Sequence, residues 1–418
     1  MGRCESEPLA ERVRELVVSD FPGRAAPVAY PSKPLWSQVK RCGSELWLDT
    51  GDIEQASSLW CEEFTAVTTN NTLLNKEVQK GTYDDLIAKA ADELRGRIPE
   101  EELPLEIAFV LNAYHGLRIS RQLGARVSVE LHTDLAHDVE RSVSYGRRYH
   151  EIAPDDFYVK VPLTPAGLVS ARELSREGIP VNFTLGFSAR QNYLVVAFSR
   201  PAFVNVFLGR LNSFVADNAL GSGRLVGEKA TLASQQAVKQ LRAELGIATR
   251  QIAASMREGS QVLSLAGVDV LTLPTKVAQE FEHLNPPSRA IASQVGRTLD
   301  VELAQDVDRE ASGLDVLWDV PDTFRRAVKE LLGTDAAGLS PEGICDFFRQ
   351  RGLADLLPQW SSSDIETVTV DGKIPRFEIW RERLARGEVG LDALVNISGL
   401  QSFATDQQAM DERIRSML

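Results

Sequence analysis

Eight short apolar runs typical of β-strands, separated by amphipathic segments typical of helices, constrain the fold of this chain more than any other feature. Strands that alternate with helices form parallel sheets with crossover helices. Eight such units within about 230 residues match a closed (β/α)8 barrel, and the chain lacks the Gly-x-Gly-x-x-Gly that a dinucleotide-binding sheet carries after its first strand. The sequence therefore predicts an α/β protein built on a (β/α)8 TIM barrel, with strands at 45–50, 64–69, 126–131, 157–162, 181–185, 203–208, 249–255 and 268–273.

One connection between predicted strands carries clear helix signals. Thr164 can cap a helix, Pro165 suits its first turn, and Gly178 follows its end shortly before Val181 begins the next strand. A capped helix between two apolar strands is what a parallel crossover requires.

The regions outside the barrel are predicted to be mainly helical. We expect an N-terminal helical extension over 1–44 with a helix at 8–21, and a barrel over 45–284. A mainly helical insertion over 285–400 should pack on the barrel, with helices at 324–332, 341–351 and 378–386 and one strand at 366–370. The last segment, 401–418, has apolar residues at 403, 410, 414 and 417, which form one stripe typical of a helix that docks on the barrel.

Composition excludes several classes of function. A net charge of −13 argues against a general nucleic-acid binder, and no run approaches the roughly 18 apolar residues of a membrane span. Four cysteines (Cys4, Cys42, Cys61 and Cys345) lie far apart without a Cys-x-x-Cys pair, which favours a reducing compartment and no disulfide framework. With no secretory leader apparent, we expect a cytoplasmic protein with no metal site.

Lys160 lies inside the apolar run Phe-Tyr-Val-Lys-Val-Pro at 157–162. A lysine buried in such a strand lowers its pKa and becomes an amine able to attack carbonyls. The alternative is an edge strand whose lysine reaches water. Because neighbouring runs also end in polar groups suited to carbonyl chemistry, we interpret Lys160 as a Schiff-base lysine.

Barrel enzymes place their chemistry at the carboxyl ends of the strands. A retro-aldol cleavage needs an amine, supplied by Lys160, and a base for the hydroxyl proton on the adjacent carbon, for which Asp49 is suited. Glu130 and Thr184 are placed to move protons and hold a water. Each residue alone could be a helix cap or a solvated group. The presence of such a polar residue at nearly every predicted strand end, however, favours an active site.

The remaining polar residues at strand ends suit a phosphorylated sugar. Guanidinium groups match phosphate oxygens, and barrel phosphate sites often lie near the later loops. A phosphate clamp is therefore assigned to Arg210, Ser255 and Arg257, and hydrogen bonds to substrate hydroxyls are assigned to Asn70, Asn182 and Asn205.

Several of these segments resemble the transaldolase family in content and order. They are Leu-Asp-Thr-Gly-Asp-Ile at 48–53, Thr-Thr-Asn at 68–70, Val-Glu at 129–130, Val-Lys at 159–160, Val-Asn-Phe-Thr-Leu at 181–185, Phe-Leu-Gly-Arg at 207–210, Ala-Ser-Met-Arg at 254–257, Ala-Gly-Val-Asp-Val-Leu-Thr at 266–272 and Phe-Ala-Thr-Asp-Gln at 403–407. The resemblance covers about 45–283 and the last sixteen residues. The helix that begins at 403 would lie across the mouth of the active site.

The resemblance implies a ping-pong transfer of a dihydroxyacetone unit between sugar phosphates in the pentose phosphate pathway, without cofactor or metal. Lys160 would bind the ketose carbonyl, Asp49 would handle the C4 hydroxyl proton, and Glu130 would act through a water held by Thr184. Donors would be sedoheptulose 7-phosphate or fructose 6-phosphate; acceptors would be glyceraldehyde 3-phosphate or erythrose 4-phosphate.

Two positions depart from the family pattern. Asn205 replaces the usual serine, which puts the handling of the ketose C1 hydroxyl in doubt, and Asn71 replaces the proline expected after Asn70, which should loosen that turn.

Two rival functions remain open. One is an aldolase of the same superfamily that releases free dihydroxyacetone; such enzymes resemble one another in having tyrosine at the position of Phe207, which lines the substrate site, and glutamine at the position of Glu130. The other is a barrel that binds sugar phosphates without catalysis, which the combination of Lys160, Asp49 and Glu130 disfavours. We expect no nucleic-acid or membrane partner, and a monomer or homodimer.

Overall fold

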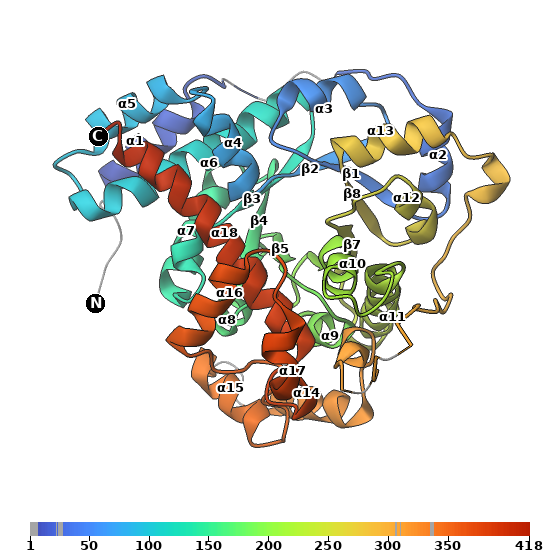
Figure 1. Ribbon diagram of the computed structural model, residues 1–418. Helices are drawn as coiled ribbons and strands as arrows, with labels where there is room; N and C mark the ends of the chain where they lie inside the picture. The colour runs from blue at the N-terminus through green and yellow to red at the C-terminus, as the bar shows by residue number, and fades with distance from the viewer. Residues whose placement is uncertain (1–6, 22, 24–27, 306, 310, 335–337) are drawn as a thin grey trace.

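In the computed structural model, which describes residues 7–21, 23, 28–305, 307–309, 311–334 and 338–418, the strands form one closed parallel barrel (Figure 1). Each strand pairs with the next, and β8 pairs back to β1. The predicted (β/α)8 barrel is confirmed, and each strand begins and ends within two residues of the predicted positions. The strands are β1 (Glu45–Asp49), β2 (Phe64–Thr68), β3 (Arg126–Glu130), β4 (Phe157–Pro162), β5 (Val181–Thr184), β6 (Phe203–Phe207), β7 (Arg250–Ala254) and β8 (Val270–Pro274).

Helices connect successive strands around the outside of the barrel. They are α3 (Ile53–Leu59), α4 (Asn71–Gln79), α5 (Asp84–Leu94), α6 (Leu103–Leu123), α7 (Val139–Ile152), α8 (Pro165–Arg176), α9 (Ala189–Ser199), α10 (Leu208–Asp217), α11 (Val226–Leu245), α12 (Ser260–Leu265) and α13 (Thr275–Leu284), with short 3-10 turns η1 (Glu100–Glu102) and η2 (Thr133–Leu135).

The connection from β4 to β5 forms as its sequence predicts. The Thr164 hydroxyl accepts a hydrogen bond from the N–H of Gly167 at 2.8 Å and donates to the carbonyl of Ala136, so the cap also joins the helix to a neighbouring loop. Pro165 occupies the first position of α8. Gly178 then adopts a φ of +80°, which favours glycine, and turns the chain into β5.

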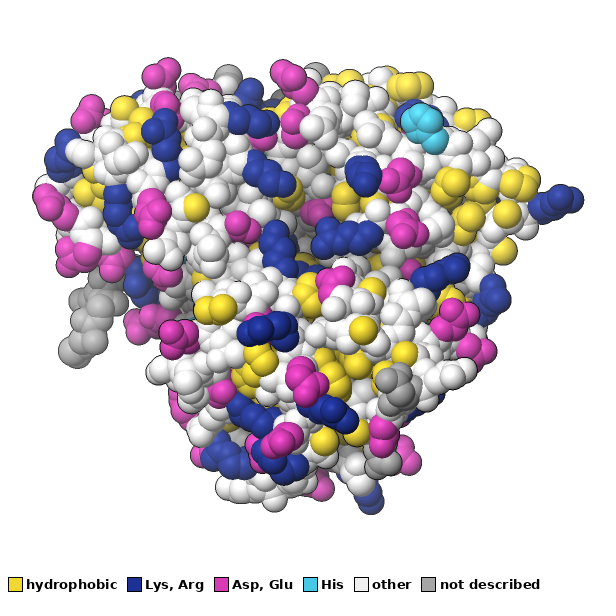
Figure 2. Space-filling view, viewed as in Figure 1, with side chains coloured by type: hydrophobic (Ala, Val, Ile, Leu, Met, Phe, Trp, Pro, Cys, Tyr) yellow, Lys and Arg dark blue, Asp and Glu magenta, His cyan; other side chains and the backbone are white. Residues whose placement is uncertain are grey.

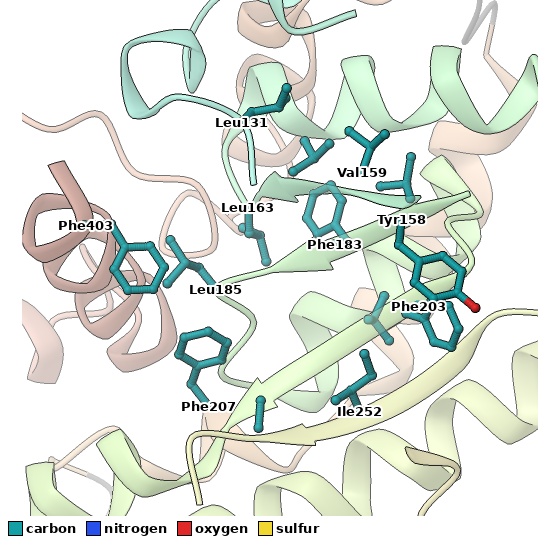
Figure 3. Packing of buried hydrophobic residues seen from close by; sticks show 14 of the residues in the cluster. Leu131, Tyr158, Val159, Leu163, Phe183, Leu185, Phe203, Phe207, Ile252 and Phe403 are labelled. Atoms are coloured by element: carbon teal, nitrogen blue, oxygen red, sulfur yellow. The ribbon is translucent and has the colours of Figure 1, made fainter. Parts of the chain in front are cut away.

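Aromatic residues fill the amino end of the barrel. The Trp47 ring stacks on Tyr158 with centroids 5.4 Å apart, and Phe203 packs edge-on against Trp47 at 4.8 Å and against Tyr158 at 4.9 Å. Figure 3 shows Tyr158 and Phe203 at one end of the strands and Phe207 at the other. The barrel is thus a packed core at its amino end.

The N-terminal extension contains two helices in its described part, α1 (Glu7–Val18), which contacts α6, and α2 (Pro34–Arg41). Trp36 of α2 is fully buried, with its ring centroid 5.3 Å from that of Phe64 and 5.0 Å from that of Phe281 of α13. Its indole N–H donates to Glu282 at 2.8 Å. Trp36 therefore fixes α2 against the barrel beside α13 (Figure 1).

The helices predicted after the barrel are present beside α8 and α9, on the lower side in Figure 1. The strand predicted at 366–370 is wrong, because this segment lies within a helix. The elements are η3 (Ser288–Ala290), η4 (Leu314–Leu317), α14 (Asp322–Gly333), α15 (Pro341–Arg349), α16 (Ser362–Asp371) and α17 (Phe377–Ala385).

A capping box explains why 366–370 is helical. The Ser361 hydroxyl accepts from the N–H of Asp364, whose carboxylate accepts from the N–H of Ser361. Thr367 and Thr369 donate their hydroxyl protons to the carbonyls four residues earlier, both at 2.7 Å. The β-branched residues favour a strand by propensity, but the cap and a single buried side chain, Val368, fit a surface helix better.

The last helix, α18 (Leu391–Arg415), is longer than predicted and crosses the carboxyl ends of the strands (Figure 1). The predicted boundary between 400 and 401 falls inside it. The side-chain amide of Asn396 donates to the carbonyls of Leu163 and Leu185, directly beyond β4 and β5, at 3.1 and 2.9 Å. Phe403 and Met410 are buried as the apolar stripe predicts.

A buried ion-pair network holds the start of α18. Arg190 of α9 lies 2.7 Å from Asp392 and 2.7 Å from Asp355, and the Ser188 hydroxyl also donates to Asp392. Asp392 is fully buried. Because a buried carboxylate requires such partners, this network fixes α18 over the barrel.

No helix in the described part of the chain has both the length and the apolar character needed to cross a membrane. Cys42, Cys61 and Cys345 are free thiols, and Cys4 lies outside the described residues.

Candidate active site

The carboxyl ends of the strands surround a cavity that is open to solvent, with about 800 Å³ of space including the solvent at its mouth. Nine of the residues predicted from strand ends line it together: Asp49, Asn70, Lys160, Asn182, Asn205, Phe207, Arg210, Ser255 and Arg257. The other two predicted residues, Glu130 and Thr184, lie at the ends of β3 and β5. The closed barrel therefore brings all eleven to one end of the sheet.

Lys160 lies at the centre of this group. It is 3% exposed, which agrees with a lysine inside a buried strand rather than at an edge. Its Nζ donates to the carbonyl of Thr69 at 3.2 Å and lies 3.6 Å from Oε1 of Glu130. Glu130 and Lys160 are direct partners in the β3–β4 pairing. A buried amine is thus held beside a buried carboxylate, with the cavity in front of it.

Asp49 faces the same cavity from the end of β1. Its Oδ1 accepts a hydrogen bond from the Thr68 hydroxyl at 2.7 Å, and Thr68 is within 2.7 Å of the Thr272 hydroxyl. Burial raises the pKa of Asp49 above the ordinary aspartate value, although the charge of Lys160 and the hydrogen bond from Thr68 act in the opposite direction. A carboxyl with a raised pKa is a suitable proton acceptor near neutral pH.

Glu130 is held from its other side by the turn after β2. Its Oε2 accepts a hydrogen bond from the backbone N–H of Asn71 at 3.1 Å. Burial raises the pKa of Glu130, and the charge of Lys160 and the Asn71 N–H oppose that rise. Proline, which the family pattern favours at position 71, could not supply this donor.

The turn at Asn71 is not loosened by the absence of proline. The Asn71 side chain donates to the carbonyl of Leu131 at 3.0 Å and accepts from Asn112 at 3.0 Å, and Asn112 also donates to the carbonyl of Glu130. Asn71 is 1% exposed. Side-chain hydrogen bonds therefore fix this turn.

Three predicted asparagines take part in structure as well as facing the cavity. Asn70 caps α4 by accepting from the N–H of Leu73 at 2.8 Å, and no hydrogen bond within the described residues uses its amide N–H groups, which can therefore donate to a ligand. Asn182 donates to Ser128 at 2.9 Å. Asn205 accepts from the N–H of Gly186 at 3.3 Å, so the residue that replaces serine also orients the loop after β5.

The buried oxygens that have no hydrogen-bond partner within the described residues include Oδ1 of Asn182 and Oγ1 of Thr184, on the strand beside Lys160. Asn182 is the direct partner of Lys160 in the β4–β5 pairing, and Thr184 is the partner of Pro162. Buried polar atoms without partners are uncommon and costly. Both can therefore serve a bound water or a substrate hydroxyl.

The part of the cavity wall that follows β6 and β7 is cationic. Arg210 lies in the first turn of α10 and is only 6% exposed. Its Nη1 has no hydrogen-bond partner in the described part of the chain, and burial together with the charge of Arg257 lowers its pKa to about 10. A buried guanidinium with a free N–H beside a second guanidinium is suited to a bound anion.

Backbone conformation brings the second cation close to the first. Ser255 has a φ of +61°, an uncommon value outside glycine, where the chain leaves β7. Gly209 permits the approach, since a Cβ there would lie 2.1 Å from the Ser255 carbonyl oxygen and 2.8 Å from Cγ of Arg257. The Arg257 N–H is held by the Gln261 side chain at 2.6 Å.

Sequence reasoning assigned no role in the site to several residues that line the cavity: Thr68, Thr72, Thr272, Lys373, Ser402 and Asp406. Thr68 and Thr272 could have been found from the period of two along β2 and β8. Phe403 lies over the mouth, 5.9 Å from Nζ of Lys160 and 5.6 Å from the Arg210 guanidinium, and Figure 3 shows it facing Leu185 and Phe207. No sequence signal marks Lys373.

Comparison with known proteins agrees with this geometry. The family model described as transaldolase/fructose-6-phosphate aldolase matches residues 46–334. A protein named transaldolase from Xanthomonas campestris pv. campestris (strain B100) is 27% identical over 307 residues, which is 68% of this chain and 94% of the relative. Another of that name from Xanthomonas euvesicatoria pv. vesicatoria (strain 85-10) is 28% identical over 277 residues, 64% of this chain and 84% of the relative.

Proposed function

The chain belongs to the transaldolase/fructose-6-phosphate aldolase family, and from that premise we propose that it is a transaldolase that acts through a Schiff base on Lys160. It would transfer a dihydroxyacetone unit from sedoheptulose 7-phosphate or fructose 6-phosphate to glyceraldehyde 3-phosphate or erythrose 4-phosphate. The observation that carries the proposal is the buried Lys160 amine, 3.6 Å from Glu130, in a cavity that it shares with Asp49.

The first half-reaction begins with attack of the neutral Lys160 amine on the ketose C2 carbonyl. Loss of water gives an iminium. Glu130 lies close enough to pass protons to the departing hydroxyl through a water, and the free hydroxyl of Thr184 is suited to hold that water.

Cleavage follows when Asp49 takes the proton of the C4 hydroxyl. The electrons of the C3–C4 bond move to the iminium, the shorter aldose phosphate leaves, and an enamine remains on Lys160. The Thr68 hydroxyl keeps the Asp49 carboxyl group oriented while Asp49 takes up and releases this proton.

In the second half-reaction the enamine carbon attacks the aldehyde of the acceptor. Asp49 returns its proton to the new alkoxide, and hydrolysis of the iminium restores the Lys160 amine. The phosphate of either sugar would bind at Arg210, Ser255 and Arg257, which supports the use of phosphorylated substrates.

Borohydride reduction tests the Schiff base directly. In the presence of fructose 6-phosphate it should fix a covalent three-carbon adduct on Lys160, identified by peptide mapping. The variant Lys160→Arg retains the charge but should give no adduct. An adduct on another lysine, or none, would contradict the proposal.

A coupled assay distinguishes transfer from release. Fructose 6-phosphate should react rapidly only when erythrose 4-phosphate is present. Comparable turnover without the acceptor, accompanied by free dihydroxyacetone, would assign the chain to the aldolase activity instead.

A further inference from the structure

Lys373, in the loop between α16 and α17, lines the same cavity as Arg210 and Arg257. We propose that Lys373 is a third cation for the phosphate group of the sugar, a specificity-determining residue supplied by the C-terminal helices rather than by the barrel. The inference rests on the proposed function, because it concerns the phosphate of the same substrates.

The loop that carries Lys373 is fixed from two directions. On one side, the Ser398 hydroxyl of α18 donates to the carbonyl of Gly372 at 2.7 Å. On the other, the Asn218 side chain donates to the carbonyl of Pro375 at 3.1 Å and accepts from the N–H of Phe377 at 2.8 Å. The backbone of Lys373 therefore has a defined place at the rim of the cavity.

Asn218 connects this loop to the helix that carries Arg210. Asn218 is the C-cap of α10, and Arg210 lies in the first turn of the same helix. Gly372 turns the chain toward the cavity with a φ of +77°, a value that favours glycine. The position of Lys373 is thus set relative to Arg210 by the fold.

The charges at this end of the cavity favour an anion. Within the described residues, neither Lys373 nor Arg257 forms an ion pair, and Nη1 of Arg210 has no hydrogen-bond partner. Asp406 lines the same rim, but its carboxylate accepts a hydrogen bond from Thr72. Figure 2 shows several Lys and Arg side chains around the recessed centre of this face.

The chemistry of lysine suits this place. Lys373 is exposed, and its ammonium is a compact charge on a flexible stem that can follow a phosphate dianion held by the more rigid guanidiniums. Since an exposed charge contributes less than a buried one, the contribution of Lys373 should be smaller than that of Arg257.

A matched pair of acceptors isolates this contribution. In a ping-pong mechanism the kcat/KM for the acceptor does not depend on the donor. With fructose 6-phosphate as donor, Lys373→Ala should lower kcat/KM for glyceraldehyde 3-phosphate by about three- to tenfold. The value for unphosphorylated glyceraldehyde should not change.

Two further variants serve as controls. Lys373→Arg keeps a cation at the rim and should retain most of the preference for the phosphorylated acceptor. Lys276→Ala removes an exposed lysine of α13 that lies 3.6 Å from Glu280 and does not line the cavity, so it should alter neither value.

Binding of inorganic phosphate, measured by calorimetry on the full chain, tests the site without catalysis. Both Arg257→Ala and Lys373→Ala should weaken it, the first more strongly. Equal losses on both acceptors, or unchanged phosphate affinity in Lys373→Ala beside a clear loss in Arg257→Ala, would overturn the assignment of Lys373. A wild-type chain that transfers nothing from any donor would contradict the proposed function instead.

Discussion

The two ends of the barrel are built from the same strands but from opposite kinds of side chain. On β1, Trp47 fills the amino end and Asp49, two residues later, faces the cavity; on β4 the same step leads from Tyr158 to Lys160. On β6 it leads from Phe203 to Asn205. Because side chains alternate along a strand, residues two apart share a face.

The two ends differ in whether their polar groups are paired within the fold. At the amino end the polar atoms are paired: Glu45 accepts from the indole N–H of Trp47 at 2.7 Å and forms an ion pair with Arg250. At the carboxyl end, buried charged groups face the cavity, and polar atoms such as Oγ1 of Thr184 and Nη1 of Arg210 have no hydrogen-bond partner among the residues that the structure describes. The first arrangement stabilises the fold, and the second is ready for a ligand.

Of the changes that test this difference between the two ends, Asp49→Asn should have the largest effect, on turnover. The amide keeps the shape of the side chain but cannot accept the C4 hydroxyl proton. Turnover should fall by about 10²–10⁴-fold, while borohydride still traps a ketose on Lys160. Near-normal turnover, measured in the coupled assay, would mean that another group takes the proton.

Trp47→Ala should have the opposite profile. Loss of a buried indole that packs on Tyr158 and Phe203 should lower the free energy of unfolding by about 3–5 kcal/mol. The kcat of the protein that remains folded should change little. Urea unfolding measures the free energy of unfolding, and Trp47→Phe serves as a milder control. A small loss of stability together with a large loss of kcat would contradict the distinction between the two ends.

Arg257→Ala should weaken the use of phosphorylated sugars by about ten- to a hundredfold in kcat/KM, because charge-assisted hydrogen bonds contribute roughly 1.5–3 kcal/mol each. Unphosphorylated dihydroxyacetone as donor should be nearly unaffected. Thermal stability should change by no more than about 0.5 kcal/mol, as for most exposed substitutions. Equal losses on both donors, or loss of folding, would make Arg257 a structural residue.

The smallest effect concerns pH and stability. The pKa of Asp49 is higher in the folded protein than in the unfolded chain, where an aspartate has a pKa of about 3.9. The protonated carboxyl therefore stabilises the fold below a pH of about 3.9, and this stabilisation is lost as pH rises through the pKa that Asp49 has in the fold. Asp49→Asn has no such proton to lose. Its melting temperature should exceed that of the wild type at neutral pH, and the difference should shrink as pH falls toward about 4. A difference that grows in acid would contradict the raised pKa.

Local signals in the sequence were enough to predict the barrel and nine of the residues that line the cavity. Apolar runs with period two, a capped helix at Thr164 and polar residues at strand ends are local signals, and closure of a parallel barrel necessarily gathers strand ends such as Asp49 and Lys160. The strand predicted at 366–370 failed because β-branched propensity was weighed above the cap at Ser361.

The way in which distant segments complete the site could be seen only from the packed fold. Glu130 receives its backbone donor from Asn71, which lies 59 residues away, and α18 brings Phe403 over Lys160. Lys373 reaches the rim because Ser398 and Asn218 hold its loop. These contacts depend on packing between elements far apart in the chain, which leaves no periodic pattern in any one segment from which they could be predicted.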